Sequence, residues 1–193
     1  MFKAKRRTVV TVTAVVAVLL AGALAVTLTQ GKGKAANATA NPNVVEYQAG
    51  QRPLAPAVTA ESLTGSTIKL SSYRGKTVVL NFWGSWCPPC RAEAPTLAVL
   101  DQQYHSHGVA FLGDDVGDSA ENALAFTHGA GITYPSINDP GYAVVQQFSQ
   151  AAPVSDTPTT VVIDKTGHVA GMVIGAVTYG EMTTLLRDAT VTQ

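Results

Sequence analysis

Hydrophobic residues follow two spacings along the chain, and these spacings predict its elements. Thr77–Trp83 is a nearly continuous apolar run, which is typical of a central strand covered on both faces. From Pro89 to His105 apolar residues recur every three or four positions, which predicts a helix. The other expected elements are a hairpin at 58–60 and 67–70, a short strand or extended segment at 132–137, strands at 109–113, 159–163 and 168–174, and helices at 118–128, 142–148 and 179–189.

Strands that alternate with helices and end in a hairpin followed by a helix predict an α/β domain with a mixed central sheet. We expect this domain to span residues 57–193. Residues 31–56 are rich in Gly, Ala, Asn and Pro and lack helical periodicity, so they are predicted to form a linker.

Residues 1–30 have the pattern of a membrane segment. Thr8–Gln30 is an uncharged run of 23 residues, long enough as a helix to cross the roughly 30 Å hydrocarbon core of a bilayer. A basic cluster at Lys3–Arg7 would keep the N-terminus in the cytoplasm. The pattern favours a single-pass signal-anchor in the cell membrane, and a secreted protein after signal cleavage is the alternative. Both interpretations place the following domain outside the cytoplasm.

The charges are unevenly distributed. The 193 residues carry 13 Lys and Arg and 13 Asp and Glu, and this net charge of zero indicates no nucleic-acid partner. Six of the basic residues lie within the first 34, so the rest of the chain is acidic, with 7 basic and 13 acidic residues. Two cysteines are too few for a disulfide scaffold, a four-thiolate zinc site or an iron–sulfur cluster, and no metal is expected.

The two cysteines lie in the segment Cys87-Pro88-Pro89-Cys90, which follows the most apolar strand and opens the predicted helix. A helix N-terminus stabilises negative charge, so we expect a lowered pKa for the Cys87 thiol. Cys87 would then attack a partner disulfide, and Cys90, one turn later and less exposed, would resolve the mixed disulfide. Because the prolines have no N–H, the Cys90 N–H is the main local donor to the Cys87 sulfur. The regular helix is expected to begin at Pro89.

Other roles for the cysteine pair fit the residues less well. A structural disulfide would close only a four-residue loop and remove little chain entropy. Haem attachment needs His after the second cysteine, where this chain has Arg91. Zinc would need two further ligands. A peroxiredoxin has Thr or Ser three residues before its reactive cysteine, where this chain has Gly84. A redox pair is therefore favoured.

Two segments resemble a known family. Residues 81–95 (NFWGSWCPPCRAEAP) are similar to the active-site segment of TlpA/ResA-like thiol-disulfide oxidoreductases, a membrane-anchored branch of the thioredoxin superfamily. Residues 157–167 (TPTTVVIDKTG) resemble that family's cis-proline strand and hairpin, and the resemblance covers about residues 52–190. It implies an α/β thioredoxin fold, in which a mixed central sheet is flanked by helices, with an N-terminal hairpin and a central TlpA-like insertion.

The resemblance also implies which residues meet the substrate. Pro158 would be cis and lie beside the cysteines, and Thr157 would present its backbone to an extended substrate segment. Trp86 and Pro88 would form the substrate-binding surface around the cysteine pair.

A further implied site residue is acidic. Glu93 occupies the position of the family's active-site glutamate, one turn after Cys90, and would exchange protons with that thiol. Thioredoxin itself has a buried Asp where this chain has Asn81, so Glu93 is the candidate acid. The chain departs from the family at residues 114–115, two aspartates that predict a more polar strand end, and at residues 151–156, a loop that contacts substrate in the family.

The implied activity is thiol-disulfide exchange with partner proteins, in which the Cys87–Cys90 pair is the redox group and no further cofactor is expected. Apocytochrome c is the usual substrate of the family, so the expected role is that of a reductant. A membrane redox-supply protein would return the enzyme to its reduced form. Two alternatives remain open: an oxidase that introduces disulfides into secreted proteins, and a non-catalytic module that holds clients in the cis-proline groove. The direction of electron flow depends on the reduction potential, which the sequence does not determine.

Overall fold

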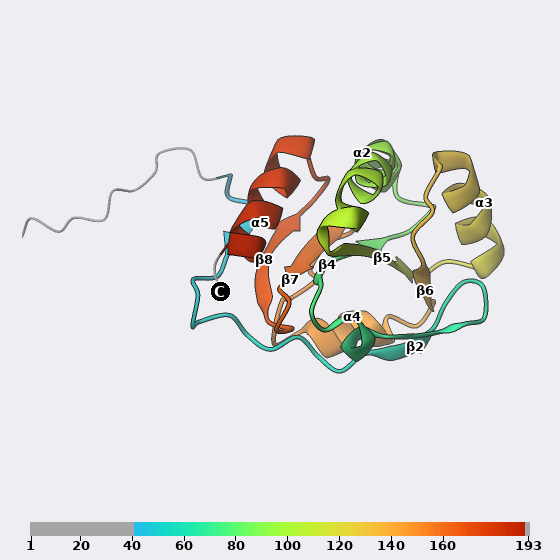
Figure 1. Ribbon diagram of the computed structural model, residues 1–193. Helices are drawn as coiled ribbons and strands as arrows, with labels where there is room; N and C mark the ends of the chain where they lie inside the picture. The colour runs from blue at the N-terminus through green and yellow to red at the C-terminus, as the bar shows by residue number, and fades with distance from the viewer. Residues whose placement is uncertain (1–40, 192–193) are drawn as a thin grey trace, which may run out of the picture. The chain divides into compact units, whose positions relative to one another are not determined.

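The computed structural model describes residues 41–191 (Figure 1). The predicted membrane segment, residues 8–30, lies outside the described residues, as do residues 31–40 of the predicted linker. Within 41–191, no helix is both long enough and apolar enough to cross a bilayer. The architecture below is that of the domain that follows these segments.

A mixed sheet forms the centre of the domain, beside a separate two-stranded hairpin. In chain order the strands are β1 (Val44–Glu46), β2 (Thr59–Glu61), β3 (Thr67–Lys69), β4 (Thr77–Trp83), β5 (Val109–Val116), β6 (Ser136–Asp139), β7 (Thr159–Ile163) and β8 (Val169–Ile174). The strand order in the central sheet is β1-β8-β7-β4-β5-β6, and β2 pairs with β3. The β4–β5 and β5–β6 pairs are parallel, and the other pairs are antiparallel. The predicted mixed sheet and N-terminal hairpin are therefore present.

Helices cover both faces of the sheet. Within the described residues they are α2 (Pro88–Tyr104), α3 (Ala120–Ala130), α4 (Ala143–Phe148), α5 (Tyr179–Val191) and the short 3-10 helices η1 (Leu70–Tyr73) and η2 (His105–His107). Figure 1 shows α2, α3 and α5 along one face, and α4 with β2 on the other. This layered arrangement agrees with the predicted fold class.

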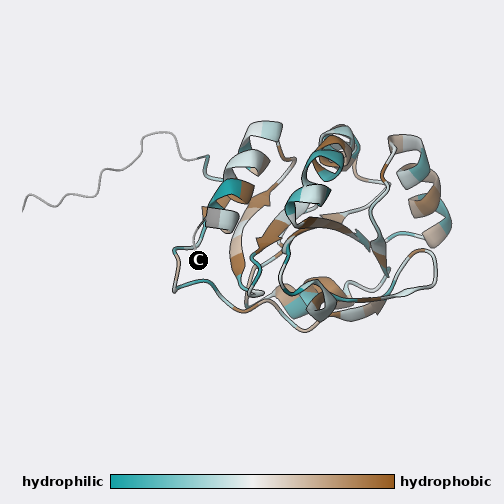
Figure 2. Cartoon of the chain, in the orientation of Figure 1, coloured by the Kyte–Doolittle hydropathy of each residue, from teal (hydrophilic) through white to brown (hydrophobic). Residues whose placement is uncertain are grey.

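The core has one apolar layer on each face of the sheet, and β4 contributes to both. All seven residues of β4 are buried, as its apolar run predicts. On one face Leu80 and Phe82 pack with Phe148 of α4, and on the other Val79 packs with Leu97 of α2. Figure 2 shows hydrophobic residues along the central strands and mixed colours along the helices. This packing fixes the C-terminal end of β4, from which the cysteine segment continues.

The structure differs from the sequence prediction at several element ends. Val44–Glu46, inside the predicted linker, pairs antiparallel with β8. Three residues are too few to show a period, and the strand forms because the edge of β8 offers hydrogen-bond partners. β5 continues past Gly113 to Val116, through two acidic residues. α2 begins at Pro88, one residue earlier than predicted, since proline is favoured in the first helical turn.

Candidate active site

Cys87 and Cys90 form a disulfide at the N-terminal end of α2. Cys87 is the N-cap residue: its N–H donates to the Gly84 carbonyl (3.1 Å), and its sulfur accepts a hydrogen bond from the Cys90 N–H (3.2 Å). The prediction that the Cys90 N–H is a local donor to Cys87 is confirmed. The Cys90 N–H and the dipole of α2 thus face the sulfur that would carry negative charge after reduction.

Both cysteines are buried. Only 1% of Cys87 and 2% of Cys90 is exposed, so the prediction that Cys87 is the more exposed is wrong for the disulfide form. Trp83 and Ala123 pack with the pair, and the carbonyl oxygen of Thr157 lies 3.5 Å from the Cys87 sulfur. These neighbours come from three different segments, which is why the sequence around the cysteines did not reveal their burial.

The loop before the disulfide is held from three sides. The Ser85 N–H donates to the Asp118 carboxylate (2.9 Å), and Arg91 Nε donates to the Ser85 carbonyl (2.7 Å). Burial opposes ionisation of Asp118, but hydrogen bonds from Ser85 and its neighbours outweigh it and lower the pKa. The Trp86 indole N–H donates to the Val116 carbonyl (3.1 Å), while 51% of Trp86 stays exposed. Trp86 therefore presents a positioned aromatic surface next to the disulfide.

The Thr157–Pro158 peptide bond is cis, as predicted. Pro158 immediately precedes β7, which pairs with β4, so the cis peptide lies beside the disulfide that follows β4. The Pro158 carbonyl accepts a hydrogen bond from the Gly175 N–H (2.8 Å). Pro158 is buried and Thr157 is partly exposed, whereas Trp86 and Pro88 are exposed. The structure thus brings together all the residues predicted to contact a substrate.

Glu93 is a buried carboxyl on α2, one turn after Cys90. Only 2% of it is exposed, and its oxygens accept hydrogen bonds from Asn81 Nδ2 (2.8 Å) and the Val177 N–H (2.8 Å). Asn81 Nδ2 also donates to Thr160 Oγ1 (2.9 Å). Burial raises the pKa of Glu93 to about 7, although its two donors oppose the shift. A carboxyl that titrates near neutral pH on the cysteine-bearing face of the helix can accept or donate a proton there.

Two further carboxyls are buried at the end of β5, where the sequence predicts only greater polarity. Asp114 and Asp115 are fully buried, and neither carboxyl accepts a hydrogen bond from any residue in 41–191. Burial raises the pKa of Asp114 to about 8, and nearby Asp139 adds to the shift. Burial raises the pKa of Asp115 to about 7, with Asp118 adding to the shift. β5 lies between β4 and β6, and this burial opposes ionisation of the two carboxyls. The local sequence does not show that strands lie on both sides of β5.

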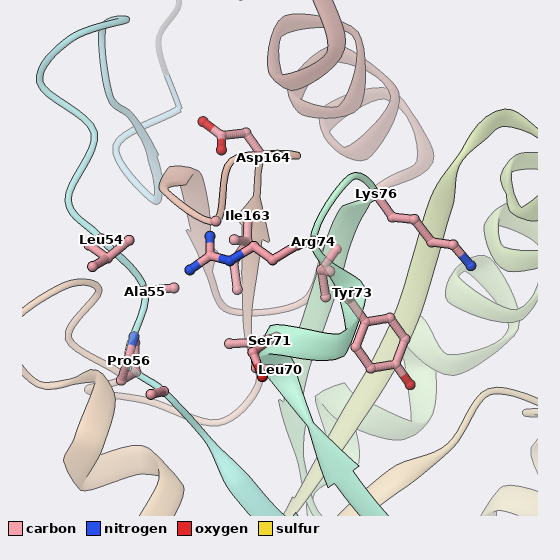
Figure 3. Close-up of a pocket in the computed structure, with 13 residues that line it drawn as sticks. Leu54, Ala55, Pro56, Leu70, Ser71, Tyr73, Arg74, Lys76, Ile163 and Asp164 are labelled. Atoms are coloured by element: carbon pink, nitrogen blue, oxygen red, sulfur yellow. The ribbon is translucent and has the colours of Figure 1, made fainter.

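A cavity of about 290 Å³ lies at the opposite end of the sheet (Figure 3). Leu70, Val78 and Ile163 form part of its apolar wall, and Figure 3 shows the Arg74 side chain extending across it. Val78 lies near the start of β4, whereas the disulfide follows the end of that strand. The cavity is therefore separate from the redox site and includes none of the residues predicted for it.

Residues 52–172 match the AhpC/TSA family. The chain belongs to this family. The matched segment contains Cys87, Cys90, Glu93 and the cis Thr157–Pro158 peptide, so the whole site described above lies inside it. Membership of the AhpC/TSA family thus rests on the part of the chain that builds the redox site.

Individual relatives give a more specific comparison than the family match. The thiol-disulfide oxidoreductase ResA of Geobacillus thermodenitrificans is 37% identical over 124 residues, which are 64% of this chain and 69% of that protein. A secreted thiol-disulfide isomerase from Corynebacterium glutamicum has a TM-score of 0.71 and 30% identity, and the match covers 78% of this chain and 96% of that one. A DsbF homologue from Corynebacterium diphtheriae has a TM-score of 0.70 and 33% identity, with coverages of 77% and 96%. These similarities confirm the predicted ResA-like family, its fold and the enzyme class, a thiol-disulfide oxidoreductase.

Proposed function

We propose that this enzyme reduces disulfides of partner proteins outside the cytoplasm, with apocytochrome c as its substrate in cytochrome c maturation. The observation that carries the proposal is the Cys87–Cys90 pair at a helix N-terminus, directly beside the cis Thr157–Pro158 peptide. The 37% identity to an enzyme named ResA supports the same assignment.

In the proposed reaction the reduced enzyme supplies two electrons. The Cys87 thiolate attacks one sulfur of the partner disulfide, and the other partner sulfur leaves and takes up a proton. Cys90 then loses its proton and attacks the Cys87 sulfur, which releases the second partner sulfur to be protonated and forms the Cys87–Cys90 disulfide of this structure. The partner gains two electrons and two protons, and a membrane redox-supply protein reduces the enzyme again.

Glu93 is proposed to hold the proton that Cys90 releases. Its pKa of about 7 and its place one turn after Cys90 support this role, because the carboxylate is available as a base near neutral pH. Trp86, Pro88 and Thr157 are proposed to contact the partner, with the Thr157 backbone pairing to an extended segment as an added strand. The cysteine pair carries the electrons, so the proposal needs no further cofactor.

The proposal places the catalytic domain on the outer side of the cell membrane, anchored through residues 8–30. The uncharged run Thr8–Gln30 and the basic cluster before it support this location. A redox pair that cycles between thiol and disulfide also suits a compartment in which disulfides form.

An oxidase or isomerase of secreted proteins is the second candidate. It is favoured by one observation, the similarity to the secreted thiol-disulfide isomerase of Corynebacterium glutamicum. The reduction potential separates a reductant from an oxidase. A value of about −120 mV indicates a strong oxidant, and a value well below about −200 mV indicates a reductant.

A trapping experiment tests the proposal. In the Cys90→Ser variant of the full chain, Cys87 attacks partners but nothing resolves the mixed disulfide, so partners remain covalently attached. Mass spectrometry of adducts isolated from cells should identify apocytochrome c or proteins that mature it. The matched Cys87→Ser variant lacks the attacking sulfur and should hold far fewer partners. A broad set of secreted proteins would support the second candidate, and equal adduct levels in the two variants would contradict both.

A further inference from the structure

Tyr142 has an unfavourable backbone conformation that burial does not explain. Its φ is 58° and its ψ is 26°, in the left-handed region, and it is the one non-glycine residue in 41–191 with a positive φ. This conformation is strained for a bulky side chain and occurs more often at functional positions. The side chain is 42% exposed, so the fold does not require a tyrosine here to fill its core.

Gly117 positions the Tyr142 ring. The N–H groups of Gly117 and Tyr142 both donate to the Asp139 carbonyl (3.2 Å each). A side chain at Gly117 would collide with the hydroxyl and ring of Tyr142, so the ring lies directly against the Gly117 backbone. The ring is thereby held in place while part of its surface remains open to solvent.

Trp86 is held in a similar way by the neighbouring backbone. Its indole N–H donates to the Val116 carbonyl, and a side chain at Gly84 would collide with its ring. Val116 and Gly117 are consecutive, with Cα atoms about 3.8 Å apart. The rings of Trp86 and Tyr142 therefore contact adjacent residues, the last residue of β5 and the one that follows it. β4, β5 and β6 are parallel, so the segments that follow their C-terminal ends share one edge of the sheet with the disulfide.

We propose that Tyr142 extends the partner-binding surface beyond Trp86 and selects partners that carry an aromatic or large apolar side chain next to the reacting cysteine. This inference rests on the proposed function, since it concerns the polypeptide that exchanges its disulfide with Cys87. The Thr157 backbone holds the partner on one side of the sulfur, and the two rings receive a partner side chain on the other. A positioned aromatic ring loses little conformational entropy when it binds and favours contacts with aromatic groups.

Two disulfide-bonded model peptides test this assignment on the reduced full-chain enzyme. They differ only beside the cysteine, where one carries Phe and the other Gly. Wild type should reduce the Phe peptide about tenfold faster, the ratio expected for a contact of about 1.4 kcal/mol. In Tyr142→Asn the ratio should fall close to one, because Asn tolerates the left-handed backbone but removes the ring. Tyr142→Phe should keep most of the preference.

Two controls separate the possible failures. Leu54→Ala removes an exposed apolar side chain at the opposite end of the sheet and should keep the wild-type ratio. Reduction of each oxidised variant by dithiothreitol reports the state of the redox centre itself. A Tyr142→Asn ratio equal to that of wild type, or an equal slowing with both peptides and with dithiothreitol, would overturn the role of Tyr142 alone. A wild-type enzyme that reacts with dithiothreitol but with neither peptide would overturn the proposed function as well.

Discussion

Glu93 and Asp114 are both buried carboxyls near the end of the sheet that carries the disulfide, yet their surroundings differ. Glu93 lies on the α2 side and accepts hydrogen bonds from Asn81 and from the backbone of Val177. Asp114 lies across from Phe82, in the layer that faces α4, and its carboxyl accepts no hydrogen bond from the described residues. The comparison shows how hydrogen-bond donors affect the pKa of a carboxyl that is buried away from solvent.

Hydrogen-bond donors lower the pKa of a buried carboxyl and so favour its ionisation in the folded protein. Burial raises both pKa values, but two donors hold that of Glu93 at about 7, whereas Asp114, with Asp139 nearby and no donor, reaches about 8. Glu93 can therefore exchange a proton near neutral pH in a defined position. Asp114 stays protonated there, and its ionisation opposes folding.

The largest expected effect is on catalysis, through Glu93→Gln. Removal of a positioned base for Cys90 should slow the resolving step by about 10²-fold, at the lower end of the range for general acid–base catalysis. The wild-type rate should rise with pH through about 7, the pKa of Glu93, and the variant should lack that rise. Single-turnover kinetics followed by tryptophan fluorescence across this pH range measure both quantities. Glu61→Gln, at an exposed carboxylate on β2, is the matched control, and an unchanged pH profile in Glu93→Gln would remove Glu93 from the mechanism.

The next effect is on stability, through Asp114→Asn. The folded protein holds the Asp114 proton more tightly than the unfolded chain, so wild-type stability should fall as pH rises from about 4 through about 8. The variant should remove most of this dependence and raise the free energy of unfolding at pH 9 by on the order of 3 kcal/mol. Denaturant unfolding at acidic and alkaline pH measures the difference. Asp115→Asn should show the same sign with a midpoint near 7, and a destabilised Asp114→Asn at pH 9 would contradict this account.

The smallest effect concerns Asp118, a partly exposed carboxylate with donors. Its lowered pKa means that it contributes stability above its ordinary pKa and loses that contribution as pH falls through the lowered value. Asp118→Asn should reduce the free energy of unfolding at neutral pH by about 0.5–1 kcal/mol, because solvent screens the interaction. The loss should disappear in acid. A variant as stable as wild type at every pH would show that the Ser85 N–H does not depend on the charge of Asp118.

Features that depend on a short stretch of residues were predictable. The strand β4 follows from a nearly continuous apolar run, and the cysteine pair at the start of α2 follows from its motif. The cis peptide before Pro158 followed from a resemblance, because a Thr-Pro sequence by itself is compatible with either isomer. These features needed no knowledge of distant contacts.

Features that depend on distant segments were not predictable. The edge strand at Val44–Glu46 exists because β8 pairs with it, and three residues are too few to show the alternation of a strand. Burial of Cys87 depends on contacts with Ala123 and Thr157, which lie far along the chain. The contact of Tyr142 with Gly117 likewise arises only when the loops after β5 and β6 meet.

A single-turnover reaction tests the central claim most directly. The reduced enzyme is mixed with an equal amount of a disulfide-bonded partner protein, the reaction is stopped with acid, and free thiols are alkylated before intact-mass analysis. We predict that the enzyme loses two alkylation sites, Cys87 and Cys90, at the same rate as the partner gains two, and that Cys87→Ser abolishes both changes. A partner that gains thiols while both cysteines stay reduced, or equal turnover by Cys87→Ser, would contradict the account.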